Sequence, residues 1–225
     1  MISEAMKTLV VAPHPDDEVL GVGGTLLRRK SEGGEVAWLI VTAISTESGF
    51  DVKRVSQRIN EIQQVTEFFG FNEVISLGFP TAQLDRVSMK DLVESISEVF
   101  KSFQPEEVFV PHPSDVHTDH RIVFDAVMSC AKWFRSPSVK RILAYETLSE
   151  TDFGLNGSHG FYPNVFIDIE QFLIDKLKAM SIYGSEIGAF PFPRSHEAIR
   201  ALATVRGASS GFRAAEAFQL MRARS

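Results

Sequence analysis

The sequence has little cysteine, since Cys130 is the only one among 225 residues. A single thiol excludes an intrachain disulfide and a metal site built from several thiolates. One reduced cysteine is typical of a protein in a reducing compartment, so we expect a cytoplasmic location.

Long hydrophobic runs and an excess of positive charge are also absent. No stretch approaches the roughly 20 apolar residues that span a bilayer, and the apolar run at residues 9–12 is too short for a signal peptide. We therefore expect no integral membrane contact. The 23 lysines and arginines stand against 29 aspartates and glutamates, which gives a formal net charge of −6. This balance argues against nucleic acid as a partner and favours a small molecule.

Short apolar runs alternate with longer amphipathic stretches along the chain. The pattern predicts strands at residues 7–12, 36–43, 73–77, 107–110, 141–145 and 165–169, and helices at 18–30, 51–69, 88–103, 118–134 and 169–183, with a last helix from Ser195. Continuous apolar strands separated by helices predict a parallel sheet. We expect an α/β fold, a Rossmann-like three-layer sandwich with a mostly parallel sheet and helices on both faces, in a single domain over residues 1–225.

Glycines gather at the start of the first predicted helix, at Gly21, Gly23 and Gly24. They resemble a phosphate-binding loop, but the Rossmann fingerprint begins directly after the strand. Here the segment PHPDDE, residues 13–18, occupies that place. We therefore expect these glycines to allow close packing of the helix on the sheet.

Two segments are rich in side chains that bind metal ions. PHPDDE follows the first predicted strand, and HPSDVHTDH, residues 112–120, follows the fourth. Ligands of open α/β sheets bind beyond the carboxyl ends of the strands, so we expect the two segments to meet at one edge of the sheet. So many carboxylates and imidazoles in one place need a compensating cation.

The residue types indicate which cation and which reaction. Imidazole and carboxylate ligands without thiolate suit Zn²⁺ and, less specifically, Fe²⁺, Co²⁺ or Ni²⁺. His14, Asp17 and one histidine of the second segment would supply three ligands and leave one position for water. Asp16 could take a proton from the metal-bound water, and a second histidine could stabilise the oxyanion and protonate the leaving amine. These groups indicate metal-assisted hydrolysis of an amide or ester.

The segment APHPDDEVLGVGG at residues 12–24, with HTDH at 117–120, resembles the PIG-L/LmbE-like deacetylases. The similarity continues through LGFP at residues 77–80 and AEAF at 215–218, so that it covers nearly the whole chain. It implies a zinc-dependent hydrolase that removes an N-acetyl group from an amino sugar or glycoconjugate. It also implies a homo-oligomer, either a trimer or a hexamer.

The resemblance implies a role for each matched residue. The metal ligands would be His14, Asp17 and His120. Asp16 would be the general base, and His117 would be the electrophile and acid for the tetrahedral intermediate.

Three further residues are implied near this centre. Asp119, or alternatively Asp115, would orient a histidine. Arg58 matches a family arginine near the acetyl-binding part of the pocket, and the alternative for it is an ion pair on the helix surface with Glu61.

The sequence departs from the family pattern at two positions. Val116 stands where some members have arginine, and Ala214 stands where some have a tyrosine that helps to hold the oxyanion. The residue that replaces this tyrosine is left open. His159, in the long loop, is one candidate, from this chain or from a neighbouring subunit, and an ordinary loop histidine is the alternative reading.

Two other functions stay open at this point. One is a metal-dependent amidase for a larger acyl group or a thiol conjugate, with Phe50, Phe79 and Phe161 as possible pocket walls. The other is a non-catalytic sugar- or nucleotide-binding protein on the same fold.

Overall fold

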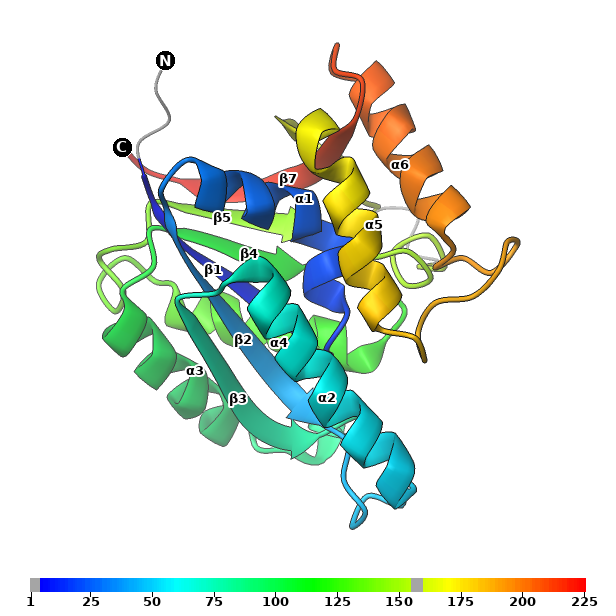
Figure 1. Cartoon of the computed structure of the whole chain (residues 1–225). Coiled ribbons are helices and arrows are strands. Elements are labelled where there is room, and N and C mark those ends of the chain that lie inside the picture. Colours follow the sequence, from blue (N-terminus) through cyan, green and yellow to red (C-terminus); the bar gives the residue numbers. More distant parts are fainter. Residues whose placement is uncertain (1–4, 155–159) are drawn as a thin grey trace.

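The computed structural model describes residues 5–154 and 160–225 (Figure 1). Its strands are β1 (Lys7–Ala12), β2 (Glu35–Ala43), β3 (Glu73–Pro80), β4 (Glu107–Pro111), β5 (Arg141–Tyr145), β6 (Val165–Asp168) and β7 (Ala215–Ala223). Its α-helices are α1 (Asp17–Ser31), α2 (Val52–Phe69), α3 (Met89–Phe103), α4 (Thr118–Cys130), α5 (Leu173–Ile182) and α6 (His196–Ala208). Short 3₁₀ turns lie at Leu84–Arg86 and Glu170–Phe172. Among the described residues, no helix is both long and apolar enough to cross a membrane.

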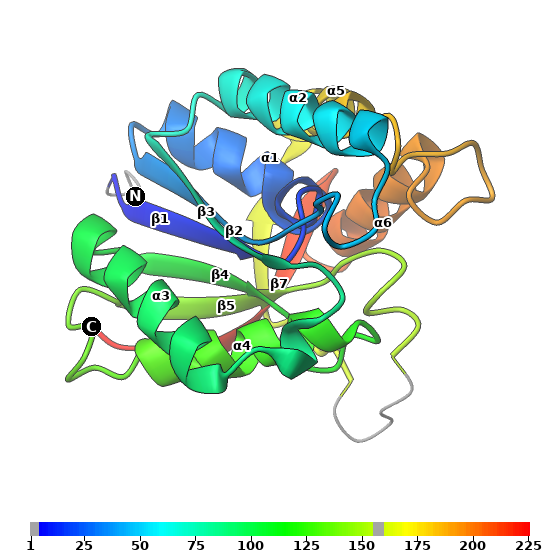
Figure 2. The ribbon, with the colours of Figure 1, turned by 90° about the horizontal axis from the view of Figure 1, so that it is seen from below.

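The strands form one seven-stranded sheet in the order β3-β2-β1-β4-β5-β7-β6. Neighbouring strands from β3 to β5 run parallel, and β7 runs antiparallel to both β5 and β6. Figure 2 shows α1, α2, α5 and α6 on one face of the sheet and α3 and α4 on the other. The predicted α/β class, with a mostly parallel sheet between two helical layers, is confirmed.

Strand β1 shows why the central strands are apolar throughout. Leu9 and Val11 pack into the core cluster that includes side chains of α3 and α4, whereas Val10 and Ala12 pack into the cluster that includes side chains of α1 and α5. Alternate residues of a strand point to opposite faces, and here both faces are covered. A continuous apolar run is the pattern that this burial requires.

The last strand, β7, was not predicted. Its sequence AEAFQLMRA is rich in residues that favour helices. The segment is nevertheless extended, because its backbone pairs with β5 on one side and β6 on the other, and pairing of this kind overrides local preference.

The fourth predicted helix is also shorter than expected, since α4 ends at Cys130 and not at residue 134. The Ser136 hydroxyl donates a hydrogen bond to the Cys130 carbonyl (3.0 Å), which satisfies a carbonyl that the helix leaves free. The apolar side chains of Trp133 and Phe134 that suggested a longer helix are exposed. The helix predicted at 169–183 begins later as well, because a 3₁₀ turn precedes α5.

The glycines of α1 allow it to approach the sheet closely, as expected. A β-carbon on Gly21 would lie 2.3 Å from the Tyr145 ring, and one on Gly24 would lie 2.7 Å from Cγ2 of Ile169. Both distances are too short for real atoms. Close packing of α1 therefore depends on hydrogen in place of a side chain at these two positions.

We expect Gly24→Ala to lower the free energy of unfolding by about 1–3 kcal/mol, the usual cost of overpacking a core. Cβ of Ile169 is itself only 2.8 Å from the added methyl group and cannot rotate away. Urea unfolding followed by circular dichroism measures the change. Gly23→Ala is the control, because its methyl group would lie 3.3 Å from Cγ of Lys176 and 3.4 Å from Cγ1 of Val19, which is tight but not a clash, and alanine favours the helix by up to about 1 kcal/mol. Equal losses in the two variants would contradict the explanation.

Candidate metal centre

The loop between β1 and α1 is held in place by its neighbours. The backbone N–H and hydroxyl of Thr42, near the end of β2, both donate to the carbonyl of Pro13, at 3.0 and 2.8 Å. The Arg58 guanidinium, from α2, donates to the carbonyl of Pro15. Both prolines of the loop are thus fixed from outside, and His14 between them has little freedom.

Asp16 adopts an unusual backbone conformation at the end of this loop. Its φ is 136°, a region that residues other than glycine rarely occupy and that costs on the order of 1–3 kcal/mol. Its backbone N–H donates to Oε2 of Glu18 (3.0 Å), and the hydroxyl of Tyr183 donates to Oε1 of the same carboxylate (2.6 Å). The surrounding structure therefore holds the strained backbone, and the Asp16 side chain lines a pocket.

The second segment begins α4. His117 is the N-cap residue of the helix, and its Nδ1 accepts a hydrogen bond from the Asp119 backbone N–H (3.1 Å). Asp119 and His120 follow in the first turn, and both are fully buried. The carboxyl ends of β1 and β4 are neighbours in the sheet, so this turn lies beside the loop of His14.

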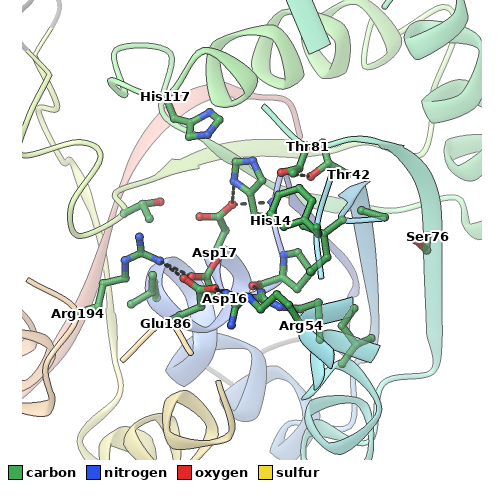
Figure 3. Close-up of a pocket in the computed structure, with 18 of the residues that line it drawn as sticks. His14, Asp16, Asp17, Thr42, Arg54, Ser76, Thr81, His117, Glu186 and Arg194 are labelled. Atoms are coloured by element: carbon green, nitrogen blue, oxygen red, sulfur yellow. Dashed lines mark hydrogen bonds and ion pairs between the residues drawn. The ribbon is translucent and has the colours of Figure 1, made fainter. Parts of the chain in front are cut away.

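Two imidazoles approach one carboxylate oxygen at the meeting point of the two segments. Oδ2 of Asp17 lies 3.4 Å from Nδ1 of His14 (Figure 3). The same oxygen lies 3.3 Å from Nε2 of His120. A tetrahedral zinc ion with bonds of about 2.0–2.1 Å separates its ligand atoms by about 3.3 Å. Nε2 of His120 is buried and has no hydrogen-bond partner of good geometry among the described residues. The geometry of these three residues, which were predicted to share a site, therefore fits a metal ion.

The outer nitrogen of each imidazole is held by a second carboxylate. Nε2 of His14 lies 3.1 Å from Oδ2 of Asp119, and Nδ1 of His120 lies 2.8 Å from Oδ2 of Asp115. The Thr151 hydroxyl donates to the other oxygen of Asp115 (2.6 Å). Carboxylates in this position orient histidine ligands and make them more basic. The sequence left Asp119 and Asp115 as alternatives for one such role, and the structure places each beside a different histidine.

A second group, made of His14, His117 and Asp119, is also compact enough to hold a cation. Its atoms are already engaged, however. The Asp119 carboxylate accepts hydrogen bonds from the backbone amides of Ala82 (2.7 Å) and Leu84 (3.2 Å). Nδ1 of His117 also accepts a hydrogen bond. In the group with Asp17 and His120, only Oδ2 of Asp17 accepts one from the described residues, from the His14 backbone N–H (2.9 Å), so this group is the better candidate.

The charges around Asp17 shift the ionisation of the whole cluster. Burial lowers the pKa of His14, but hydrogen bonds to Asp119 and Asp17 outweigh it and raise the pKa to about 9. Burial is likewise outweighed at His120, where Asp17 and Asp115 raise the pKa well above its usual value. The same two imidazoles lower the pKa of Asp17 well below its usual value in spite of burial. This surplus of carboxylates attracts positive charge, which a divalent cation would supply.

Asp16 has a partner that the sequence did not suggest. Nη1 of Arg194 donates to Oδ2 of Asp16 (2.7 Å) and also lies 3.1 Å from Oε2 of Glu186 (Figure 3). Burial and the negative charge of Asp17 raise the pKa of Asp16 to about 7, against the opposing effect of Arg194. No residue of the described chain donates a hydrogen bond to the other oxygen, Oδ1, so it is available to a ligand.

His117 presents its other nitrogen as a donor. Because Nδ1 accepts a hydrogen bond from the Asp119 amide, the neutral ring carries its proton on Nε2. Burial and the positive charges of His14 and His120 lower the pKa of His117 to about 4, so the ring is neutral near pH 7. The ring centre lies 4.4 Å from that of His14, and the side chain lines the same pocket as Asp16.

The pocket has a volume of about 270 Å³. The predicted site residues that line it are His14, Asp16, Asp17, Arg58 and His117. His120 and Asp119 lie behind them, fully buried. All seven residues predicted for the site thus lie together, although they come from α2 and from the starts of α1 and α4, which are distant in the sequence.

Arg58 is buried in the wall of this pocket. Its guanidinium pairs with Glu186, and Nε lies 3.1 Å from Oε2 of Glu61. Nη1 and Nη2 are hydrogen-bonded, to Pro15 and Glu186 respectively, whereas Nε has only the ion pair with Glu61 among the described residues. The ion pair with Glu61 is therefore present, but it is internal rather than on the helix surface, and substrate binding by Arg58 stays a prediction.

Several functional candidates were missed because no motif marks them. Arg194 and Glu186 lie in the irregular segment between α5 and α6. Thr147 and Ser149 follow β5, and their buried hydroxyls line the pocket without a hydrogen-bond partner in the described chain. They are possible donors to a ligand.

The positions that depart from the family pattern lie outside the pocket wall. Ala214 packs in a small apolar cluster with Ile169, Leu173 and Ala203. Val116 is 52% exposed. His159 lies outside the described residues, so its proposed contribution to the oxyanion contacts is untested.

Comparison with known proteins identifies the family. Residues 9–131 match the model of the PIG-L family, described as GlcNAc-PI de-N-acetylase. The diacetylchitobiose deacetylase of Thermococcus kodakarensis is 25% identical over 97% of this chain and 84% of that protein. The 2′-N-acetylparomamine deacetylase of Streptomyces fradiae is 25% identical over 80% of this chain and 73% of that protein.

A solved structure supports the same assignment. A conserved protein of Thermus thermophilus is 28% identical, and it superimposes with a TM-score of 0.78 over 98% of this chain and 96% of that one. The chain belongs to the PIG-L family and is a deacetylase, a hydrolase that acts on carbon–nitrogen bonds.

Proposed function

We propose that the protein is a zinc-dependent hydrolase that removes an N-acetyl group from an amino sugar or glycoconjugate. The observation that carries the proposal is the approach of His14 and His120 to one oxygen of Asp17, with each outer imidazole nitrogen held by a carboxylate. Similarity to the deacetylases of diacetylchitobiose and 2′-N-acetylparomamine supports the substrate class.

Two imidazoles and one carboxylate suit Zn²⁺, and Fe²⁺, Co²⁺ and Ni²⁺ use the same donors. We assign the metal to Nδ1 of His14, Oδ2 of Asp17 and Nε2 of His120. A cation held there would polarise the acetyl carbonyl and lower the pKa of a water molecule.

Asp16 is placed to act as the general base. Its Oδ2 is held by Arg194, which leaves Oδ1 to accept a proton from the attacking water. The water oxygen forms a bond to the acetyl carbon, and the bond from that carbon to nitrogen then breaks. The proton held by Asp16 passes to the amine nitrogen, so that the products are acetate and a free amine.

His117 is placed to bind the carbonyl oxygen as negative charge develops on it. Its Nε2–H lines the pocket, and the tautomer is set by the Asp119 amide on the other side of the ring. A donor aimed at developing charge contributes to catalysis by stabilising the transition state. This tautomer supports hydrogen bonding by His117, and its further role as the acid stays a prediction.

We expect His120→Ala to lose metal and activity together, because it removes one ligand from a site of three. Zinc content after chelation and reconstitution, measured by mass spectrometry, gives the first quantity, and acetate release from N-acetylglucosamine derivatives gives the second. His196→Ala is the control, since this exposed histidine bonds to Ser181 outside the pocket. Full zinc content in His120→Ala would contradict the ligand assignment.

We expect Asp16→Asn to keep its zinc and to lower kcat by roughly 10²–10⁴-fold, the usual contribution of a general base. The amide keeps the shape of the side chain but cannot accept the proton from water. Zinc content and kcat are measured on the same preparation, beside Asp17→Asn, which should lose both. Wild-type turnover in Asp16→Asn would refute the role of base.

A further inference from the structure

Helix α2 carries an apolar stripe that is covered along only part of its length. Near its end, Val65 and Phe69 are buried in the core, with exposed fractions of 0% and 4%. Nearer its start, Val52 and Ile59 are exposed by 65% and 62%. The spacing of three and four residues is the same in both halves. The stripe therefore continues beyond the core that it was expected to cover.

The position of the helix explains this difference. The loop after β2 carries the chain past the end of the strand before α2 begins at Val52. Figure 1 shows the first turns of α2 projecting beyond the carboxyl ends of the central strands. Within residues 5–154 and 160–225, no strand lies beneath these turns to bury their apolar side chains.

These side chains instead face the pocket of the metal centre. Val55, Ile59 and Ile62 line it from α2, and Ile44 and Phe50 line it from the loop after β2. We call these five residues the apolar wall. The same pocket is lined by His14, Asp16 and His117, so the apolar wall and the catalytic residues share one cavity. Of the three phenylalanines proposed from the sequence as pocket walls, only Phe50 is among the described residues that line it.

Most of the other lining residues are polar. They include Arg54, Glu150, Glu186 and Arg194, together with His14 and Asp17 of the metal centre. The apolar wall offers no side-chain hydrogen-bond donor or acceptor, although a sugar hydroxyl buried against it would need one. A ligand that fits both parts of the cavity has a polar end at the metal and an apolar group beside α2.

We propose that the apolar wall binds a hydrocarbon or aromatic group of the substrate, so that the enzyme prefers amphipathic amino sugars to free N-acetylglucosamine. This inference rests on the proposed function and names the substrate class more closely. The apolar group is a substituent on the sugar, since the proposed function has acetyl on the nitrogen. A longer acyl chain on the nitrogen would bury hydrocarbon against the same side chains, and the test distinguishes it.

The test compares kcat/KM for N-acetylglucosamine, its octyl glycoside and N-octanoylglucosamine. We expect wild-type protein to prefer the octyl glycoside to the free sugar by about tenfold or more, in line with the effect of a few buried methylene groups. Preference for the octanoyl compound over both acetylated sugars would overturn the inference, because the apolar group would then lie on the amide. Ile59→Ser should reduce the ratio of octyl to free sugar about tenfold. Ile174→Ser, an exposed isoleucine of α5 outside the pocket, should leave the ratio unchanged.

Binding provides a readout that does not depend on turnover. Calorimetry on Asp16→Asn should show tighter binding of the preferred octyl compound than of the free sugar, and Ile59→Ser in the same background should remove the difference. Deacetylation of all three substrates at equal efficiency would refute the apolar wall but leave the proposed function standing. Absence of turnover with any substrate, together with tighter octyl binding, would refute the proposed function alone. If Ile59→Ser dissociates an oligomer and lowers activity on every substrate equally, the face is a subunit interface and the inference is wrong.

Discussion

The arrangement of the site depends on the buried carboxylate of Asp17, which lies between two imidazoles. His14 and His120 approach the same oxygen from different segments of the chain, so the two segments must be held at one place. Buried charges of this kind are costly unless they are paired. Asp119 and Asp115 hold the outer sides of the two rings, and this adds negative charge to the cluster. A divalent cation would balance that charge, so the geometry that holds the two imidazoles beside Asp17 also suits a metal ion.

A second chain of ionic contacts connects this centre to the helices around it. Arg194 joins Asp16 to Glu186, and Arg58 joins Glu186 to the carbonyl of Pro15. The contacts tie α2 and the segment after α5 to the loop between β1 and α1. Since Asp16 also has a strained backbone, its orientation depends on residues that are far from it in the sequence. The proposed base is therefore positioned by the tertiary structure as a whole.

Helix α2 shows how one regular sequence pattern can serve two purposes. Its second half packs on the sheet and stabilises the fold, while its first half extends past the strands and lines the catalytic cavity. The periodicity of the sequence is the same throughout, because it depends only on the helix. Whether a given apolar residue faces core or ligand depends on what lies opposite, and a pattern within one helix contains no information on that.

The sequence by itself determined the α/β class and the meeting of His14 and Asp17 with the histidine segment 112–120, because both follow from local rules. The choice of His120 within that segment came from the family resemblance. Apolar runs flanked by helices require a parallel sheet, and residues that follow neighbouring parallel strands meet at the same edge. The tertiary structure alone decided that residues 215–223 form a strand, because their preference for helix is overcome by pairing with β5 and β6. Only the tertiary structure places Arg194 beside Asp16. It also places Asp119 beside His14 and Asp115 beside His120. These contacts join segments that are far apart in the sequence, so no residue spacing predicts them. They depend on how the chain packs in three dimensions.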